Sequence, residues 1–170
     1  MSTVLYTPSV IIDTVAEAIG AFLQPFVGTA QIVRARQNRV AMPSDPCVIL
    51  NDIGIYDLET PTTSNDSANQ LGNILGPARI DFQADIYGSA AGDQCKSIKG
   101  VFRTPYATSQ FPANIQPLYC SDGIQSPLVT GEEQYDSRWI ITMSFEYLPV
   151  VTVPQQSAIQ LAMNITEEIN

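Results

Sequence analysis

The sequence contains no histidine and few charged residues, and both features narrow the functions open to it. Histidine is the commonest general base and metal ligand, so its absence removes the usual centre of acid–base and metal chemistry. The 170 residues include 8 Lys and Arg against 17 Asp and Glu, a net charge of −9, which disfavours a surface that grips nucleic-acid phosphates. With only 15% charged residues, the composition is typical of a subunit that covers its surface against other proteins. A bland acidic protein fits the same composition equally well.

Cysteine is scarce, and no long apolar run is present. Cys47, Cys95 and Cys120 are widely spaced and form no CxxC pair, so we expect three buried, reduced thiols and no zinc or redox site. No apolar segment approaches the length of a membrane span, and the first residues lack the basic and apolar regions of a secretory signal. We therefore expect a protein made and used in a soluble, reducing compartment, with no membrane partner and no cofactor.

The clearest structural signal lies at residues 134–157, which read QYDSRWIITMSFEYLPVVTVPQQS. Apolar residues alternate with polar ones, as in a strand with one buried side. The alternating set is Trp139, Ile141, Met143, Phe145 and Tyr147. Pro149 and Pro154 lack backbone donors, so we expect sheet pairing to stop there. The chain then divides into an α+β domain at residues 1–149 and an extended arm at 150–170 that docks on a neighbouring subunit.

The remaining periodicity predicts two helices and several strands. A helix is expected from Thr7 and Pro8 to Pro25, and a second over residues 88–103 with Cys95, Ile98 and Phe102 on its buried side. Strands are expected at residues 30–37, 47–50 and 79–87. Strand runs separated by single helices indicate an α+β fold, with a mostly antiparallel sheet flanked by two helices.

Residues 53–77 are polar and rich in turn formers, which predicts a long loop after the second strand. Two interpretations are open: a mobile surface loop, or an element that becomes ordered only in an assembly. Apolar residues near its ends would anchor it to an adjoining partner. These candidate anchors are Tyr56, Leu58, Ile74 and Leu75.

Few residues suggest chemistry. Asp81 and Asp85 share the polar side of one strand, but no third ligand or nearby lysine completes a metal or nuclease set, so we do not expect an enzyme. The single basic cluster, RARQNR, contains Arg34, Arg36 and Arg39. Without interleaved aromatics it is a weak nucleic-acid signal.

We instead expect the three arginines to pair with acidic residues of another subunit, such as Glu132 or Glu133. In the arm, Val151, Val153 and Ile159 are the candidate contacts across a subunit boundary.

Four segments carry a resemblance: IDFQADIYG at 80–88, PLYCSDG at 117–123, QYDSRW at 134–139 and YLPVVTVPQQSA at 147–158. In their order and spacing they resemble the neck- and tail-terminator-like proteins of tailed bacteriophages. The resemblance implies a small α+β subunit of a ring, commonly a homohexamer, at the head-proximal end of a tail. Such a ring ends the tail tube, joins it to the neck or connector and leaves a channel for DNA. Residues 53–76 are too variable to be carried over.

The partners implied are other copies of the chain, tail-tube and sheath proteins, neck or head-completion proteins, and DNA that passes without specific binding. The implied location is the tail–neck junction of a virion, after synthesis in the host cytoplasm. The alternatives are another head–tail adaptor, a tail-tube subunit, or a small acidic binding module or metal-assisted enzyme.

Overall fold

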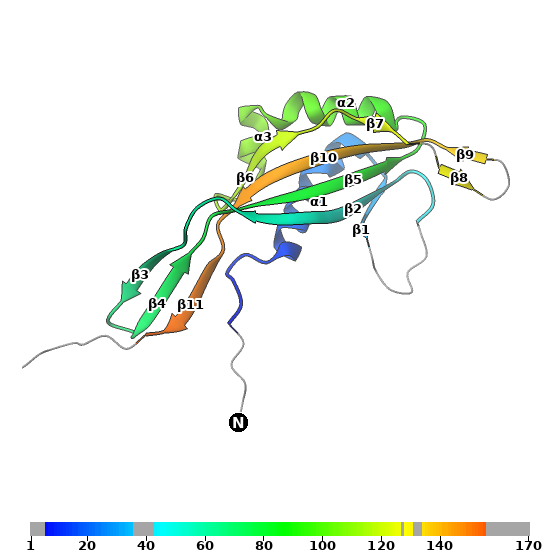
Figure 1. Cartoon of the computed structure of the whole chain (residues 1–170). Helices are drawn as coiled ribbons and strands as arrows, with labels where there is room; N and C mark the ends of the chain where they lie inside the picture. The colour runs from blue at the N-terminus through cyan, green and yellow to red at the C-terminus, as the bar shows by residue number, and fades with distance from the viewer. Residues whose placement is uncertain (1–5, 36–42, 127, 131–133, 156–170) are drawn as a thin grey trace, which may run out of the picture.

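The computed structural model describes residues 6–35, 43–126, 128–130 and 134–155. Within these ranges the chain forms helices, two larger sheets and a small two-stranded hairpin (Figure 1). The elements are α1 (Ile12–Val27), β1 (Gln31–Arg34), β2 (Cys47–Asp57), β3 (Thr62–Asp66), β4 (Leu71–Leu75), β5 (Ala78–Tyr87), α2 (Ala91–Phe102), α3 (Pro105–Gln110), β6 (Ile115–Cys120), β7 (Ile124–Gln125), β8 (Leu128–Thr130), β9 (Gln134–Asp136), β10 (Arg138–Tyr147) and β11 (Val150–Pro154).

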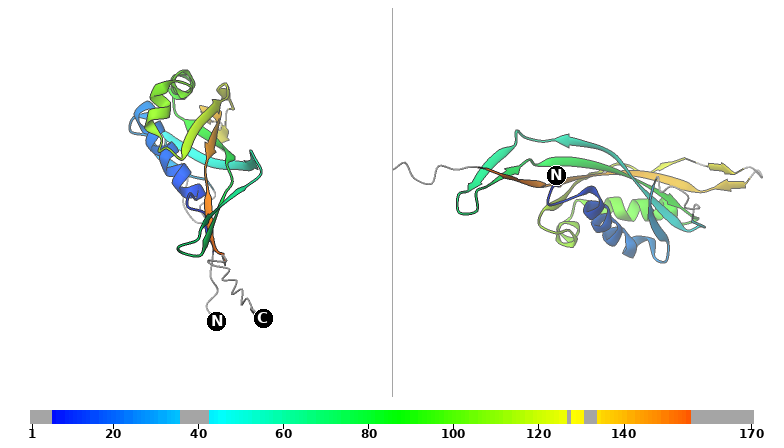
Figure 2. Two further views of the ribbon diagram at one scale, coloured as in Figure 1. Left: turned by 90° about the vertical axis from the view of Figure 1, so that its left-hand side faces the viewer. Right: turned by 90° about the horizontal axis from the view of Figure 1, so that it is seen from below.

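The main sheet has the strand order β1-β2-β5-β10-β6, and the short strand β7 pairs with the start of β10, at Trp139 and Ile140. β1 and β2 are parallel, whereas the other pairs are antiparallel. All three helices lie on one face of this sheet, which leaves its other face uncovered (Figure 2). The predicted α+β fold with a mostly antiparallel sheet is therefore confirmed, with a short third helix in addition to the two expected.

The core lies between the main sheet and the helices, where the alternation along each strand places one apolar row. Ile141, Met143 and Phe145 of β10 are fully buried, as predicted. Cys95, Ile98 and Phe102 form the buried side of α2, also as predicted. Aromatic rings join the layers: Phe102 lies edge-on to Phe145 at 5.3 Å between ring centroids. Burial of these side chains away from water is the main source of the domain's stability.

The prediction of a long loop over residues 53–77 is wrong. β2 continues to Asp57, and β3 and β4 then form a hairpin that pairs with β11 in the order β11-β4-β3. At the hairpin turn, Asp66 accepts hydrogen bonds from the backbone and side-chain nitrogens of Asn69, and these bonds lower the pKa of its carboxyl. Side-chain bonds of this kind allow a polar sequence to turn tightly. The third strand comes from a distant part of the chain, so local composition gave no sign of it.

The prediction that Pro149 and Pro154 stop sheet pairing is also wrong. Val150 to Pro154 pair with Leu75 to Leu71 in register. Pro149 precedes the strand and Pro154 ends it, and an edge strand tolerates a missing donor at such positions. The expected arm thus begins as a strand of the chain's own sheet, and residues 156–170 lie outside the described residues.

The first helix begins later than predicted. The described residues before Ile12 are not helical, and Ser9 is held by Val150: the Ser9 amide donates to the Val150 carbonyl at 2.9 Å, and the Val150 amide donates to Ser9 Oγ at 3.1 Å. The helix runs past Pro25 and ends at Gly28, whose φ of 63° suits glycine. Among the described residues, no helix has the length and apolar character to span a membrane.

Candidate functional site

The sheet β11-β4-β3, which we call the projecting sheet, extends beyond one end of the main sheet (Figures 1 and 2). Its strands continue from the main sheet: the amide of Leu58 donates to the carbonyl of Pro77 at 3.0 Å, and that of Gly76 to Pro149 at 3.5 Å. Among the described residues, no helix covers either of its faces (Figure 2). A sheet without a covering layer is marginally stable by itself, and its apolar side chains are open to a contact with another molecule.

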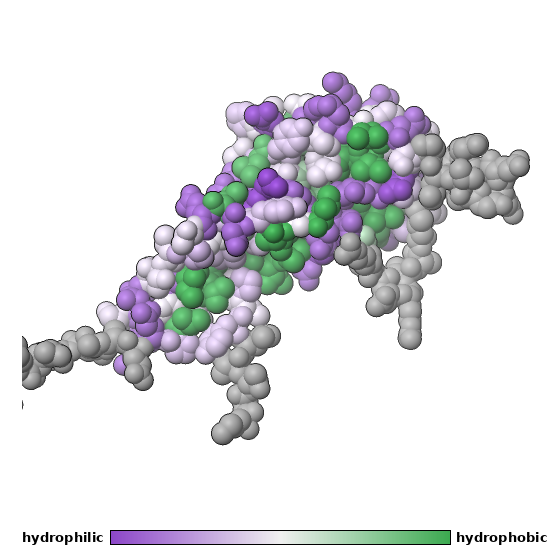
Figure 3. Space-filling model, viewed as in Figure 1, coloured by the Kyte–Doolittle hydropathy of each residue, from purple (hydrophilic) through white to green (hydrophobic). Residues whose placement is uncertain are grey.

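Apolar side chains lie on both faces of the projecting sheet. The register places Ile74 and Val151 opposite each other, with Val153 on the same face because side chains alternate along a strand. Leu75 and Val150 pair on the opposite face. All five side chains are only half-buried. Figure 3 shows apolar side chains exposed at this end of the molecule.

Two further apolar side chains lie where the projecting sheet meets the main sheet. Tyr56 is 47% exposed and Leu58 is 45% exposed. The Tyr56 ring stacks on the guanidinium of Arg79, 4.5 Å from the centroid, and Arg79 also pairs with Asp81 at 3.2 Å. The predicted neighbour-contact residues are thus brought to one end of the molecule, and their role in a contact stays a prediction.

The uncovered face of the main sheet carries paired charges. Asp85, only 8% exposed, accepts a hydrogen bond from Arg138 Nη2 at 2.6 Å and one from Gln83 Nε2 at 2.7 Å. Hydrogen bonds to both carboxylate oxygens, one of them from a cation, fit a structural role for Asp85 in the sheet. Among the described residues, no group of three or more potential ligands could hold a metal ion.

Arg34 lies on the helix-covered side, at the edge of the main sheet. Its guanidinium binds Asp13 of α1 at 2.6 Å and Asp52 of β2 at 2.9 Å. Both partners belong to the same chain, so any bond to another subunit would be additional to these. The other predicted charged contacts, Arg36, Arg39, Glu132 and Glu133, and the arm residue Ile159 lie outside the described residues.

Next to Arg34, a groove of about 740 Å³ runs along the junction between α1 and the edge strand β1. Small residues of α1 line it, namely Ala16, Gly20 and Ala21, together with Ile32 of β1. A Cβ placed on Gly20 would lie 3.9 Å from Ile32 Cγ2, so the helix meets the strand through its least bulky side. Sequence reasoning missed this groove because it depends on the packing of α1 beside β1, two elements joined by a tight turn.

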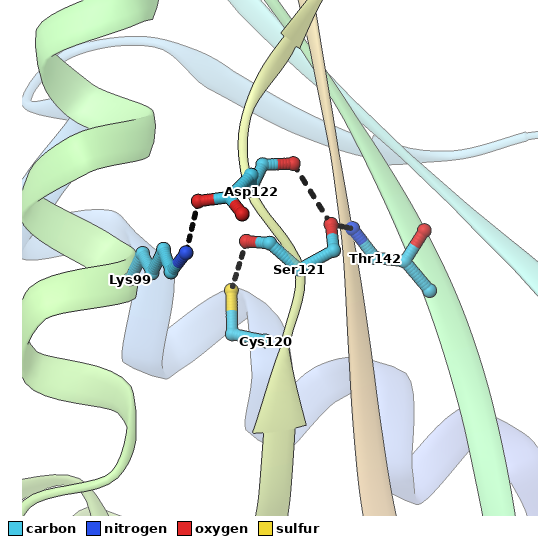
Figure 4. Close-up of polar contacts among 5 residues, drawn as sticks. All are labelled: Lys99, Cys120, Ser121, Asp122 and Thr142. Atoms are coloured by element: carbon cyan, nitrogen blue, oxygen red, sulfur yellow. Dashed lines mark hydrogen bonds and ion pairs between the residues drawn. The ribbon is translucent and has the colours of Figure 1, made fainter.

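The loop after β6 is fixed to β10 and α2 by polar contacts (Figure 4). The Thr142 amide donates to Ser121 Oγ at 2.9 Å, and Lys99 of α2 forms an ion pair with Asp122. This ion pair raises the pKa of Lys99 and lowers that of Asp122. Nearby, burial raises the pKa of the Cys120 thiol to about 12. A thiol that stays protonated is a poor nucleophile.

Residues 13–170 match the family model described as phage neck terminator protein. No curated protein matches the sequence.

Proposed function

The chain belongs to the phage neck terminator protein family, and we propose that it forms a ring at the head-proximal end of a phage tail. Membership gives it a structural role in the neck or tail of a virion, in association with other head and tail proteins. The proposed ring, commonly a hexamer in the resembling proteins, ends the tail tube and joins it to the neck or connector. Its central channel lets DNA pass without specific binding.

The observation that carries the ring proposal is the projecting sheet. It carries half-buried apolar side chains on two faces, and none of the described helices packs against it (Figure 2). In an isolated subunit these side chains meet water, whereas in a ring they would lie against neighbouring subunits. We assign Val151 and Val153 to the contact between subunits.

Tyr56, Leu58, Ile74 and Leu75 would contact the adjoining neck or tail component, and because Ile74 lies beside Val151 on one face, this contact would border the one between subunits. The domain boundary between residues 149 and 150 belongs to the same proposal, with 150–170 acting as the assembly arm.

The charge distribution supports a channel that does not retain DNA. The net charge is −9, and Arg34, Arg79 and Arg138 each lie within ion-pair distance of a carboxylate. Paired arginines offer little attraction to phosphate, and a net negative wall repels a polyanion. Arg36 and Arg39 would pair with Glu132 or Glu133 of a neighbouring subunit, which would withdraw them from DNA in the same way.

Electron microscopy of phage assembled without this protein tests the proposal. We expect heads and tails that fail to join, and tails of uneven length. Antibody labelling of complete virions should mark a single band between head and tail. Label along the whole tail would instead identify a tube subunit, and normal infectious particles without the protein would refute a terminator role.

A further inference from the structure

We propose that the C-terminal residues 156–170 of one subunit add as a strand to β1 of a neighbouring subunit and fill the groove beside α1. This inference rests on the proposed self-association and names its contact. It follows from three observations: the free backbone edge of β1, the sequence pattern of the C-terminal segment, and the point in the fold at which that segment begins.

β1 ends the main sheet and pairs only with β2 among the described strands. In this parallel pair, the amides of Gln31 and Ala35 donate to the carbonyls of Pro46 and Leu50. Since hydrogen-bonding groups alternate along a strand, the amides and carbonyls of Ile32 and Arg34 point to the other edge. This edge borders the groove, so a strand bound there would place one row of its side chains against α1.

The C-terminal segment has the composition of such a strand. Within SAIQLAMNIT, at residues 157–166, apolar residues occupy every second position and small or polar residues the positions between them. The apolar row is Ile159, Leu161, Met163 and Ile165. This period of two fits a strand with one buried side. No charge occurs between residues 147 and 166, so the stretch that carries the apolar row brings no carboxylate toward Asp13 and Glu17 at the groove rim; Glu167 and Glu168 follow it.

The position of β11 directs the segment away from its own groove. Pro154 pairs with Leu71 at the far end of the projecting sheet, whereas Arg34 pairs with Leu50 in the main sheet. Strands rise about 3.3 Å per residue, so the distance along the sheets from the Pro154–Leu71 pair to the Arg34–Leu50 pair is about 40 Å. Met163 lies nine residues past Pro154 and reaches about 32 Å when fully extended. The segment is too short to place its apolar row in its own groove, so a neighbour's groove is the one it can fill.

Chemical cross-linking between two variants of the full chain tests the contact. One variant carries Ala21→Cys in the groove and the other Met163→Cys in the segment, and they are mixed before assembly and treated with a short bis-maleimide. Cys47, Cys95 and Cys120 are buried and serve as an unreactive background. The matched control replaces Ala21→Cys by Ser97→Cys on the exposed side of α2. We expect a covalent dimer from the first mixture and none from the control.

Amide hydrogen exchange supplies a second readout on unmodified rings. Relative to a chain ending at Gln155, the full chain should show about tenfold slower exchange at Ile32 and Arg34. Gln31 and Ala35 should exchange equally in both, because their amides already bond to the segment 46–50.

A ring that forms without the cross-link and with unchanged edge amides would overturn this contact while leaving the proposed function intact. In a single chain that carries both Ala21→Cys and Met163→Cys, a cross-link formed only within that chain would overturn it as well. A full chain that stays monomeric would overturn both the contact and the ring.

Discussion

Ending the chain after Pro149 should unfold the β3–β4 hairpin while leaving the main domain folded. The cut removes β11, whose five positions pair with Leu71 to Leu75. A two-stranded hairpin without a covering layer is marginally stable in water. The core residues of β5 and β10 lie before the cut and keep their partners on α1 and α2.

The size of the effect follows from the ladder that is lost. A backbone hydrogen bond contributes about 1 kcal/mol net, and cross-strand side-chain pairs add about 0.2–1 kcal/mol each. Loss of the five-position ladder should therefore lower the free energy of opening the hairpin by about 2–5 kcal/mol. Since about 1.4 kcal/mol corresponds to tenfold, amides at residues 62–75 should exchange at least about 30-fold faster.

Hydrogen exchange measures this change in hairpin stability directly. The chain ending at Pro149 is compared with a matched control that ends at Gln155, both as monomers. The control keeps β11 and the bond from the Gln155 amide to the Gln70 carbonyl at 2.8 Å. Amides at residues 80–86 of β5 should exchange equally in both chains. Unchanged protection of residues 62–75 in the chain that ends at Pro149 would refute the argument that β11 stabilises the hairpin. Unfolding of the whole chain would show that β11 belongs to the main core.

Three further outcomes are expected. Phe102→Ala should lower the free energy of unfolding by about 3–5 kcal/mol in urea titrations, because its ring is fully buried; a loss below about 1 kcal/mol would contradict the aromatic core. Arg138→Ala should lower the free energy of unfolding by about 1–3 kcal/mol, because it leaves the nearly buried Asp85 carboxylate without its cation. The double variant with Asp85→Ala should lose less than the sum of the two single variants. Burial raises the pKa of Cys95 to about 11 and that of Cys120 to about 12, so both thiols should resist Ellman's reagent at pH 8. The unfolded chain releases these protons near pH 9, so the melting temperature should fall as the pH rises from about 9 toward those values.

The main sheet was predictable because its strands carry their burial in the local pattern. In β10, alternate residues from Trp139 to Tyr147 face the core, and that alternation is visible in the sequence. α2 was predictable for the same reason, with its buried residues at helical spacing and a glycine at its start. Gly88 adopts a φ of 122° in the turn from β5 to α2, a conformation that favours glycine.

The projecting sheet was not predictable, because its pairing depends on residues distant in sequence. Thr62 to Asp66 are all polar; they pair with the neighbouring strand β4, and the third strand β11, which supports this hairpin, comes from a distant part of the chain. The local sequence predicts an arm at Val150–Pro154, because Pro149 before it and Pro154 at its end argue against sheet pairing and its partner strand β4 is distant in the sequence. The candidate anchors Tyr56, Leu58, Ile74 and Leu75 were nevertheless identified from composition, since apolar residues beside polar turns are visible without the fold.

The central claim is that this chain assembles into a ring, and the mass of the purified full-length protein tests it most directly. Multi-angle light scattering across a range of concentrations, alone and with the tail-tube protein, should find a closed assembly of fixed mass or a monomer–ring equilibrium. Six copies of the 18.5 kDa chain is the expected assembly. A strictly monomeric protein at high concentration, still monomeric when the tail tube is present, would contradict the account.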